Sequence, residues 1–390
     1  MPFHYTSDME PFHSLTSDVD ADPLAVGESQ AACALALGRL DGLLDGLTED
    51  EKRLFCWTLL RQALLGALVQ AGFADAEMRF DGWFAGTDRA PRETALTSCP
   101  AHALVRAVLA ELTRHPWQLL ADAALVIDRC GRFAPDRALG SDDSDPSAAL
   151  AEAAGLVMTS HLPGGPLPFP ALAILSAQLR QSRTFAPIER GEATPLPGTA
   201  LPVARTAPRT PLWAIDLHLG HLLASEMGLT PALPFCGAVT AEALAPRLRD
   251  GERAVVLAEG LCRSAERHIA AIRQARADCR ALGQRLRHLR TSARAPQVWL
   301  LLRGFAPMGI EQLTTAFAIS RRGTYAVADA LVEAGLARRA MILGRVALVA
   351  LPPGTDDAVH EPLSPLPSPL LAEFDAAMAD IDRLLARQSG

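Results

Sequence analysis

The stretch from residue 297 to residue 351 reads QVWLLLRGFAPMGIEQLTTAFAISRRGTYAVADALVEAGLARRAMILGRVALVAL and decides the C-terminal part of the fold. Apolar residues recur in it at helical spacing in three short segments, which Pro307 and an Ile-Ser pair separate. Ser320 is suited to begin the third helix, because its hydroxyl accepts a backbone N–H of the first turn. Gly335 is suited to end that helix. The pattern therefore predicts three consecutive helices, the second over 310–317.

Two β-prone runs follow the third helix, over 338–343 and 345–351, on either side of a Leu343-Gly344 turn. Three helices followed by such a hairpin predict a winged helix-turn-helix with a small β-wing. In that arrangement the third helix enters the DNA major groove and presents its N-terminal residues to base edges.

The polar residues of this segment occupy the positions that a winged helix turns towards DNA. They are Ser320, Arg321, Arg322, Thr324 and Tyr325 at the start of the third helix, and Arg338, Arg339 and Arg345 on the wing. Guanidinium groups suit phosphates and guanine edges. The sequence therefore predicts a site for double-stranded DNA. The alternative is a winged helix that contacts protein, with Arg321 and Arg322 as a solvated helix start.

The charge is distributed unevenly along the 390 residues, although the net charge is −7. Residues 1–150 carry 23 acidic against 12 basic residues, whereas residues 251–351 carry 16 arginines against 7 acidic residues. A basic C-terminal region within an acidic chain predicts a polyanion-binding surface. Ten of the arginines lie in a predicted long helix over 251–294, either as a phosphate-facing strut (Arg287, Arg290 and Arg294) or as a solvated face.

The seven cysteines are scattered and form no CxxC pair, which favours reduced thiols in a cytoplasmic protein. No apolar run reaches transmembrane length, so we expect no membrane association.

We expect a mainly α-helical chain. Its predicted divisions are a loose arm over 1–27, a helical domain over 28–294, the winged helix-turn-helix over 297–351, a Pro-rich linker over 352–369 and an amphipathic helix over 370–387. Within the helical domain we expect helices over 30–47, 48–68, 100–113, 117–130, 170–183, 211–227 and from Thr240 onward, a loop-rich insert over 76–98, and loops near 131–148 and 187–211.

Motifs for catalysis, phosphate loops and paired-cysteine metal sites are not found in the sequence. His218 and His221 lie three apart on a predicted helix, near Asp216 and Glu226, so a metal site is geometrically possible. The alternative is ordinary helix surface, and no third ligand is placed by spacing. We therefore expect no cofactor, no metal and no catalytic residue.

Several stretches resemble Fic-type proteins, whose helical domain often precedes a C-terminal winged helix. The likeness is greater still to a group of uncharacterised rhizobial plasmid proteins, which join a helical domain of unknown function to a helix-turn-helix. The residues that carry it are AEMRFD at 76–81 with Trp83 and Phe84, AHALVRA at 101–107, PALAIL at 170–175 leading to FAPI at 185–188, and 213–229. The resemblance implies a Fic-like helical bundle in the N-terminal domain.

The sequence departs from active Fic enzymes after Phe185. Their motif has a catalytic His, then Phe, an acidic residue, Gly-Asn-Gly and Arg, whereas this chain continues APIERGEATPLPGTALPVARTAPRTPLW. No nucleotidyl-transfer residue can be assigned, so the resemblance implies a degenerate scaffold.

The sequence as a whole favours a DNA-binding transcriptional regulator, with a helical domain for sensing or dimerisation. A homodimer is expected, because one winged helix rarely gathers enough base contacts. Two alternatives stay open: a Fic-type nucleotidyl-transferase relative with residual activity, and a plasmid-maintenance protein whose winged helix binds protein.

Overall fold

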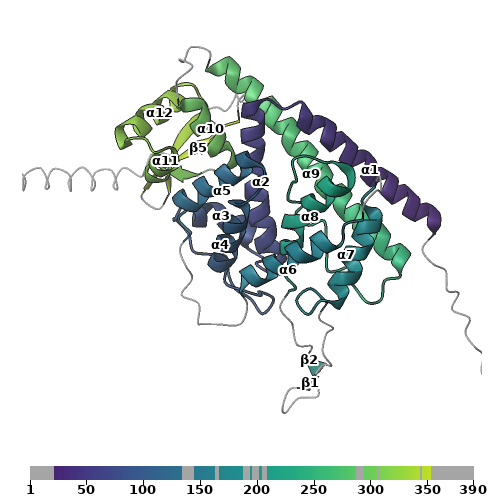
Figure 1. Ribbon diagram of the computed structural model, residues 1–390. Coiled ribbons are helices and arrows are strands. Elements are labelled where there is room, and N and C mark those ends of the chain that lie inside the picture. Colours follow the sequence, from purple (N-terminus) through teal and green to yellow (C-terminus); the bar gives the residue numbers. More distant parts are fainter. Residues whose placement is uncertain are drawn as a thin grey trace, which may run out of the picture. The chain divides into compact units, whose positions relative to one another are not determined.

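The computed structural model describes residues 22–133, 145–162, 167–187, 194–195, 202–203, 209–286, 294–305, 307–342 and 345–352 (Figure 1). This part of the chain is mainly helical, with a small antiparallel sheet near its C-terminal end. Its helices are α1 (Pro23–Asp45), α2 (Glu49–Gln70), α3 (Ala76–Phe84), α4 (Ala101–Leu112), α5 (Gln118–Cys130), α6 (Pro146–Thr159), α7 (Phe169–Gln181), α8 (Leu212–Met227), α9 (Asp250–Arg285), α10 (Ala295–Gly304), α11 (Ile310–Phe317) and α12 (Arg321–Glu333). Its strands are β1 (Thr194–Pro195), β2 (Pro202–Val203), β3 (Met308–Gly309), β4 (Ala337–Ile342) and β5 (Arg345–Ala350).

The first two helices begin at local capping signals. At α2 the Glu51 backbone N–H donates to Thr48 Oγ1 at 3.4 Å, and Thr48 N–H donates to Glu51 Oε2 at 2.9 Å, which confirms the predicted capping box. At α1 the Asp22 side chain caps the helix and Pro23 occupies its first position. The helix therefore starts inside the predicted arm, seven residues before the expected residue 30; residues 1–21 lie outside the described part.

α8 forms the centre of the helical body, because its residues from Leu212 to Gly220 are all buried. The long helices α1 and α9 lie side by side along one face (Figure 1). α2 packs on α4, α5, α8 and α9 and reaches α10 as well. Gly220 permits a close approach, since a Cβ at this position would lie 2.1 Å from the Leu233 carbonyl oxygen.

Asp216 fastens α8 to the loop that follows it. Its Oδ1 accepts the Val239 N–H at 3.0 Å, and its Oδ2 accepts from Gly237 N–H and Gln70 Nε2. Burial raises the pKa of this carboxyl to about 7, although these hydrogen bonds oppose the shift. A single buried side chain thus organises the connection between α8 and α9.

The C-terminal sheet has the strand order β3-β5-β4, and both pairings are antiparallel. The hairpin of β4 and β5 agrees with the two predicted β-runs, with Ala337 opposite Ala350 and Ile342 opposite Arg345. β3 was not predicted; its two residues pair with Leu348 and Ala347. The elements follow one another as α10, β3, α11, α12, β4 and β5.

Several predicted elements of the helical domain were wrong. The expected loop-rich insert over 76–98 begins with helix α3, whose Phe80, Trp83 and Phe84 are buried. α6 was not predicted. The helix expected from Thr240 is a series of turns, in which the Thr240 hydroxyl accepts the Ala243 N–H at 3.4 Å.

The long helix α9 ends at Arg285, and residues 287–293, with Arg287 and Arg290, lie outside the described part. Most of the loops at 131–148 and 187–211, the linker after Pro352 and the helix at 370–387 lie outside it as well. The described residues up to Leu351 belong to one compact unit, in which α10 packs on α2 and α11 on α5. None of the helices in the described ranges is both long and apolar enough to cross a bilayer.

Candidate functional site

The start of α12 is defined by Ser320, as the sequence predicted. Its Oγ accepts the Gly323 N–H at 3.1 Å. Arg321 and Arg322 follow in the first turn, and both are exposed. Neither forms an ion pair with any residue in the described part of the chain. Tyr325, one turn further on, is 40% exposed, so the helix presents two arginines and an aromatic ring to solvent.

Thr324 does not belong to this exposed group, which corrects its predicted contact with DNA. It is only 1% exposed. Its Oγ1 lies 2.9 Å from Thr314 Oγ1 and donates to the Ser320 carbonyl oxygen at 3.2 Å. Thr324 therefore ties α12 to α11 and sets the orientation of the arginines instead of contacting a ligand.

The two described wing arginines point to opposite faces of β4, as successive side chains of a strand do. Both are exposed. Arg339 forms an ion pair with Asp329 of α12, so it faces that helix. Arg338 faces away from it. Arg345 lies opposite Ile342 in the hairpin, and its side chain lies outside the described part.

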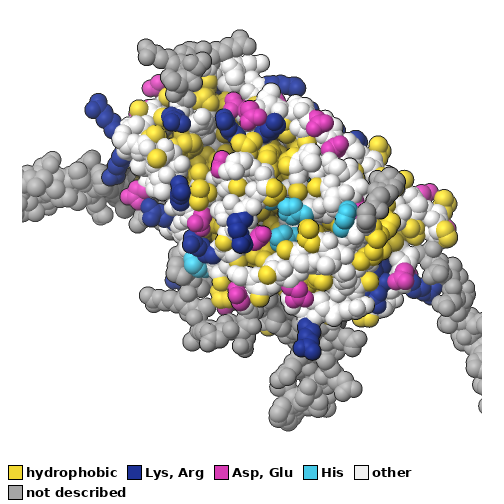
Figure 2. All heavy atoms as spheres, viewed as in Figure 1, with side chains coloured by type: hydrophobic (Ala, Val, Ile, Leu, Met, Phe, Trp, Pro, Cys, Tyr) yellow, Lys and Arg dark blue, Asp and Glu magenta, His cyan; other side chains and the backbone are white. Residues whose placement is uncertain are grey.

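A cleft of about 450 Å³ separates the start of α12 from the helical body. Arg321 and Tyr325 line one side of it, and Thr87 and Arg132 line the other. Arg132 reaches across to Glu311 at 3.3 Å. This arginine was missed by the sequence interpretation, because it follows α5 at the start of a loop and only the fold brings it near α12. Figure 2 shows basic side chains, in dark blue, projecting from this part of the molecule.

Gln312 holds α11 against the helical body. It is 2% exposed, and its Nε2 donates to the Phe84 carbonyl oxygen at 3.0 Å and to the Cys130 carbonyl oxygen at 3.2 Å. Its Oε1 accepts the Gly309 N–H at 2.9 Å. One side chain thus connects the second helix of the C-terminal segment to the ends of α3 and α5. The body therefore fixes the direction in which α12 points.

Four titratable side chains gather between the end of α4 and α8. The ring centroids of His115 and His218 lie 5.7 Å and 6.0 Å from that of His221, and His218 Nε2 lies 3.8 Å from Glu111 Oε1. Burial lowers the pKa of all three histidines, that of His115 to about 4. The rings are therefore neutral at pH 7.

The set that spacing suggested around His218 and His221 does not form. Asp216 turns to the loop after α8, and Glu226 accepts from the backbone N–H of Leu162 at 2.9 Å beside His161. The ring Nδ1 of His115 accepts the Trp117 N–H at 3.1 Å. Within the described ranges, no three His, Cys, Asp or Glu side chains are placed to hold a metal ion.

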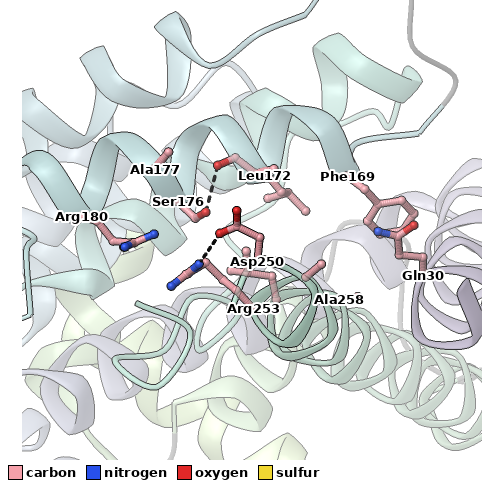
Figure 3. A pocket seen from close by; sticks show the side chains of 12 residues that line it. Gln30, Phe169, Leu172, Ser176, Ala177, Arg180, Asp250, Arg253 and Ala258 are labelled. Atoms are coloured by element: carbon pink, nitrogen blue, oxygen red, sulfur yellow. Dashed lines mark hydrogen bonds and ion pairs between the residues drawn. The ribbon is translucent and has the colours of Figure 1, made fainter. Parts of the chain in front are cut away.

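A smaller groove of about 220 Å³ lies between α1, α7 and α9 (Figure 3). Its charged residues are Arg180, Asp250 and Arg253, of which Arg253 is buried and forms structural hydrogen bonds. The guanidinium donates to the carbonyl oxygens of Ala243, Ala245 and Leu248, and to Asp250 at 2.8 Å. These bonds fasten the turns before α9 and leave the groove without an evident chemical role.

The sequence matches no protein-family model, and no curated protein is significantly similar to it. The stretch after Phe185, in which a Fic-type motif is expected, lies largely outside the described residues.

Proposed function

We propose that this chain is a DNA-binding protein, a transcriptional regulator that reads double-stranded DNA through α12 and the β4–β5 hairpin. The order helix, strand, helix, helix, strand, strand, with the sheet order β3-β5-β4, supports a winged helix. In proteins of that kind the third helix enters the major groove.

The observation that carries the proposal is the first turn of α12. Arg321 and Arg322 are exposed, and no described carboxylate neutralises them. Ser320 and Thr324 fix the helix from within, so the two guanidiniums project from a rigid support. Arginine forks match phosphate oxygens and the O6 and N7 atoms of guanine. Arg338 on β4 is exposed as well and extends the positive surface, whereas Arg132 across the cleft is paired with Glu311.

The proposal includes a homodimer, because a single winged helix makes few base contacts. The body of helices α1 to α9 then provides dimerisation or sensing, and its relation to Fic-type proteins is one of scaffold without reaction. We also place the protein in the cytoplasm, which its seven free cysteines support.

Recovery and sequencing of the DNA bound to the full-length protein in cells tests the proposal. We expect one enriched motif made of two inverted half-sites, and salt-dependent binding of a duplex that carries it. Absence of any enriched sequence, together with no binding of duplex DNA at low salt, overturns the proposal and leaves the winged helix as a protein-binding surface.

A further inference from the structure

A third cavity, of about 660 Å³, lies between α2, α3 and α9 of the body and α10 of the C-terminal segment. Its volume is within the range of small-molecule sites. Three arginines line it, one each from α2, α9 and α10, together with two aspartates: Arg61, Arg267, Arg303, Asp81 and Asp278. Leu54, Ala271 and Ala275 provide an apolar part of the wall. The cavity thus joins a charged rim to an apolar surface.

The aspartates hold two of these guanidiniums in place. Arg61 donates from a terminal nitrogen to Asp81 Oδ1 at 2.8 Å, and Arg303 donates from Nε to Asp278 Oδ2 at 2.8 Å. Asp278 is 4% exposed and also accepts from Gln274 at 2.8 Å. Each carboxylate therefore occupies only part of a guanidinium that carries five N–H donors.

The remaining donors give the cavity its chemistry. Arg303 keeps both terminal nitrogens, because its bond to Asp278 uses Nε. Arg267 donates from one terminal nitrogen to the Cys236 carbonyl oxygen, which carries no full charge. Three guanidiniums against two carboxylates leave the lining with one net positive charge. Such an arrangement attracts an oxyanion and offers it hydrogen bonds in the fork geometry that phosphates and carboxylates accept.

We propose that this cavity binds a small organic oxyanion, whose phosphate or carboxylate group is held by Arg61, Arg267 and Arg303. A single inorganic ion fills only a small part of 660 Å³, so the ligand has an organic remainder. Thr58 and Gln62 also line the cavity and can bond its polar groups.

The ligand also acts on DNA binding, and this second part rests on the proposed function. Arg303 belongs to α10, and Trp299 of the same helix donates from Nε1 to the Leu336 carbonyl oxygen at 3.0 Å, where α12 leads into β4. A ligand that binds Arg303 therefore contacts α10, the helix that supports the proposed DNA-reading helix α12. Binding of the oxyanion is independent of that coupling and can be measured without DNA.

Isothermal titration of the full-length protein with pyrophosphate and with citrate, at low salt, tests the site. We expect saturable binding of one probe per chain, and the tighter probe distinguishes a phosphate from a carboxylate ligand. Arg61→Gln and Arg267→Gln should each weaken binding about tenfold or more, because each removes a charged donor. These two residues are preferred to Arg303, whose loss leaves the buried Asp278 without its cation. Arg263→Gln, at an exposed arginine of α9, is the matched control and should bind as the wild type does.

Three results overturn the site: no saturable binding of either probe, wild-type binding by both cavity variants, or loss of binding in an Arg321→Ala/Arg322→Ala protein. The last result locates the anion on the start of α12. If the probe binds but leaves the affinity for DNA unchanged, the coupling is wrong and the site stands. If the protein binds no DNA at all, the proposed function fails while the titration still decides the site.

Discussion

Replacement of both arginines at the start of α12 gives the most direct test of the proposed DNA-reading surface. Arg321, Arg322 and Arg338 are exposed and form no ion pair with described residues, whereas Arg339 is paired with Asp329. Each phosphate neutralised by such an arginine adds about 0.9 to the slope of log affinity against log salt. Three of them predict a slope of about 2.7 for each bound copy, and the double variant Arg321→Ala/Arg322→Ala lowers that slope by about 1.8.

The loss of affinity distinguishes base reading from phosphate contact. If either arginine reads a guanine, its replacement costs about 1–3 kcal/mol of specific binding and relaxes the preference at one position of the site. If both contact phosphates, affinity falls equally on specific and non-specific duplexes. Fluorescence anisotropy with a labelled duplex, at about six salt concentrations from roughly 50 to 300 mM, measures both the affinity and its salt slope.

The matched control is Arg263→Ala, because its side chain is 60% exposed on α9, outside the C-terminal segment. Exposed substitutions of this kind change stability by about 0.5 kcal/mol or less, so a thermal unfolding scan should show that every variant is folded. The reasoning is refuted if the double variant and the control keep the same affinity and the same salt slope as the wild type.

Three further predictions concern what holds the site in place. Gln312→Leu leaves the Cys130 carbonyl oxygen without its side-chain donor, whereas the Phe84 carbonyl oxygen keeps the Arg132 N–H, so we expect urea unfolding to show a loss of about 1–3 kcal/mol; an unchanged midpoint contradicts the role of Gln312 as the connection to the body. Thr324→Val keeps the shape but removes the hydroxyl that bonds Thr314, and should lower stability by about 1 kcal/mol while leaving the salt slope of DNA binding unchanged; a lower slope shows that Thr324 contacts DNA. Burial lowers the pKa of His268 to about 4. Between about pH 6.5 and pH 4 the unfolded chain therefore binds a proton at this residue more readily than the folded chain does. The free energy of unfolding consequently falls as the pH is lowered through this range. Asp216, whose pKa is raised, acts in the opposite direction, so the wild type is compared with His268→Gln. Between pH 7 and pH 5 the free energy of unfolding should fall by about 2 kcal/mol less in the variant than in the wild type. Equal losses contradict the lowered pKa of His268.

Elements with signals inside their own sequence were the ones that could be predicted. Thr48 and Glu51 lie within one turn, and Ile310 to Phe317 carries its apolar residues and its bounding Gly309 locally. α6 also had such signals, since Asp145 caps it and Pro146 occupies its first position. It was nevertheless missed, because its many alanines give only a weak apolar periodicity. The missed helix is thus a failure to use its capping residues.

Other elements depend on contacts between distant residues. α3 has a glycine at position 82, which weakens a helix, and Phe80, Trp83 and Phe84 stabilise it by burial against residues from other elements. The turns after Thr240 are the opposite case, because a helix was predicted and none forms. A good capping residue is present, but Pro246 follows six residues later and prevents a helix of ordinary length. Local propensity was overruled by tertiary packing in the first case and by proline in the second.

The candidate site shows the same division. Ser320 and the exposure of Arg321 and Arg322 follow from a cap and a polar first turn, which sequence displays. Thr324 and Tyr325 were both predicted to face DNA, but only Tyr325 is exposed and Thr324 is buried, because one residue along a helix is a rotation of about 100°. A polar threonine gave no reason to expect burial, because its partner Thr314 is on another helix.

The proposed DNA-reading helix α12 belongs to a segment that the helical body holds by direct contacts, which favours regulation through the body. α11 is bonded to the body through Gln312, and α10 packs so closely on α2 that a Cβ at Gly304 would lie 2.5 Å from Trp57 Cβ. A winged helix on a flexible tether would bind DNA whatever its body senses, whereas one built into the body changes direction only when that packing changes. Arg303 and Gly304 line the oxyanion cavity and belong to the same α10. The proposed ligand of that cavity would therefore act on α10, which packs on α2 of the body and supports the proposed DNA-reading segment, so that rigid docking and effector control would both follow from one interface.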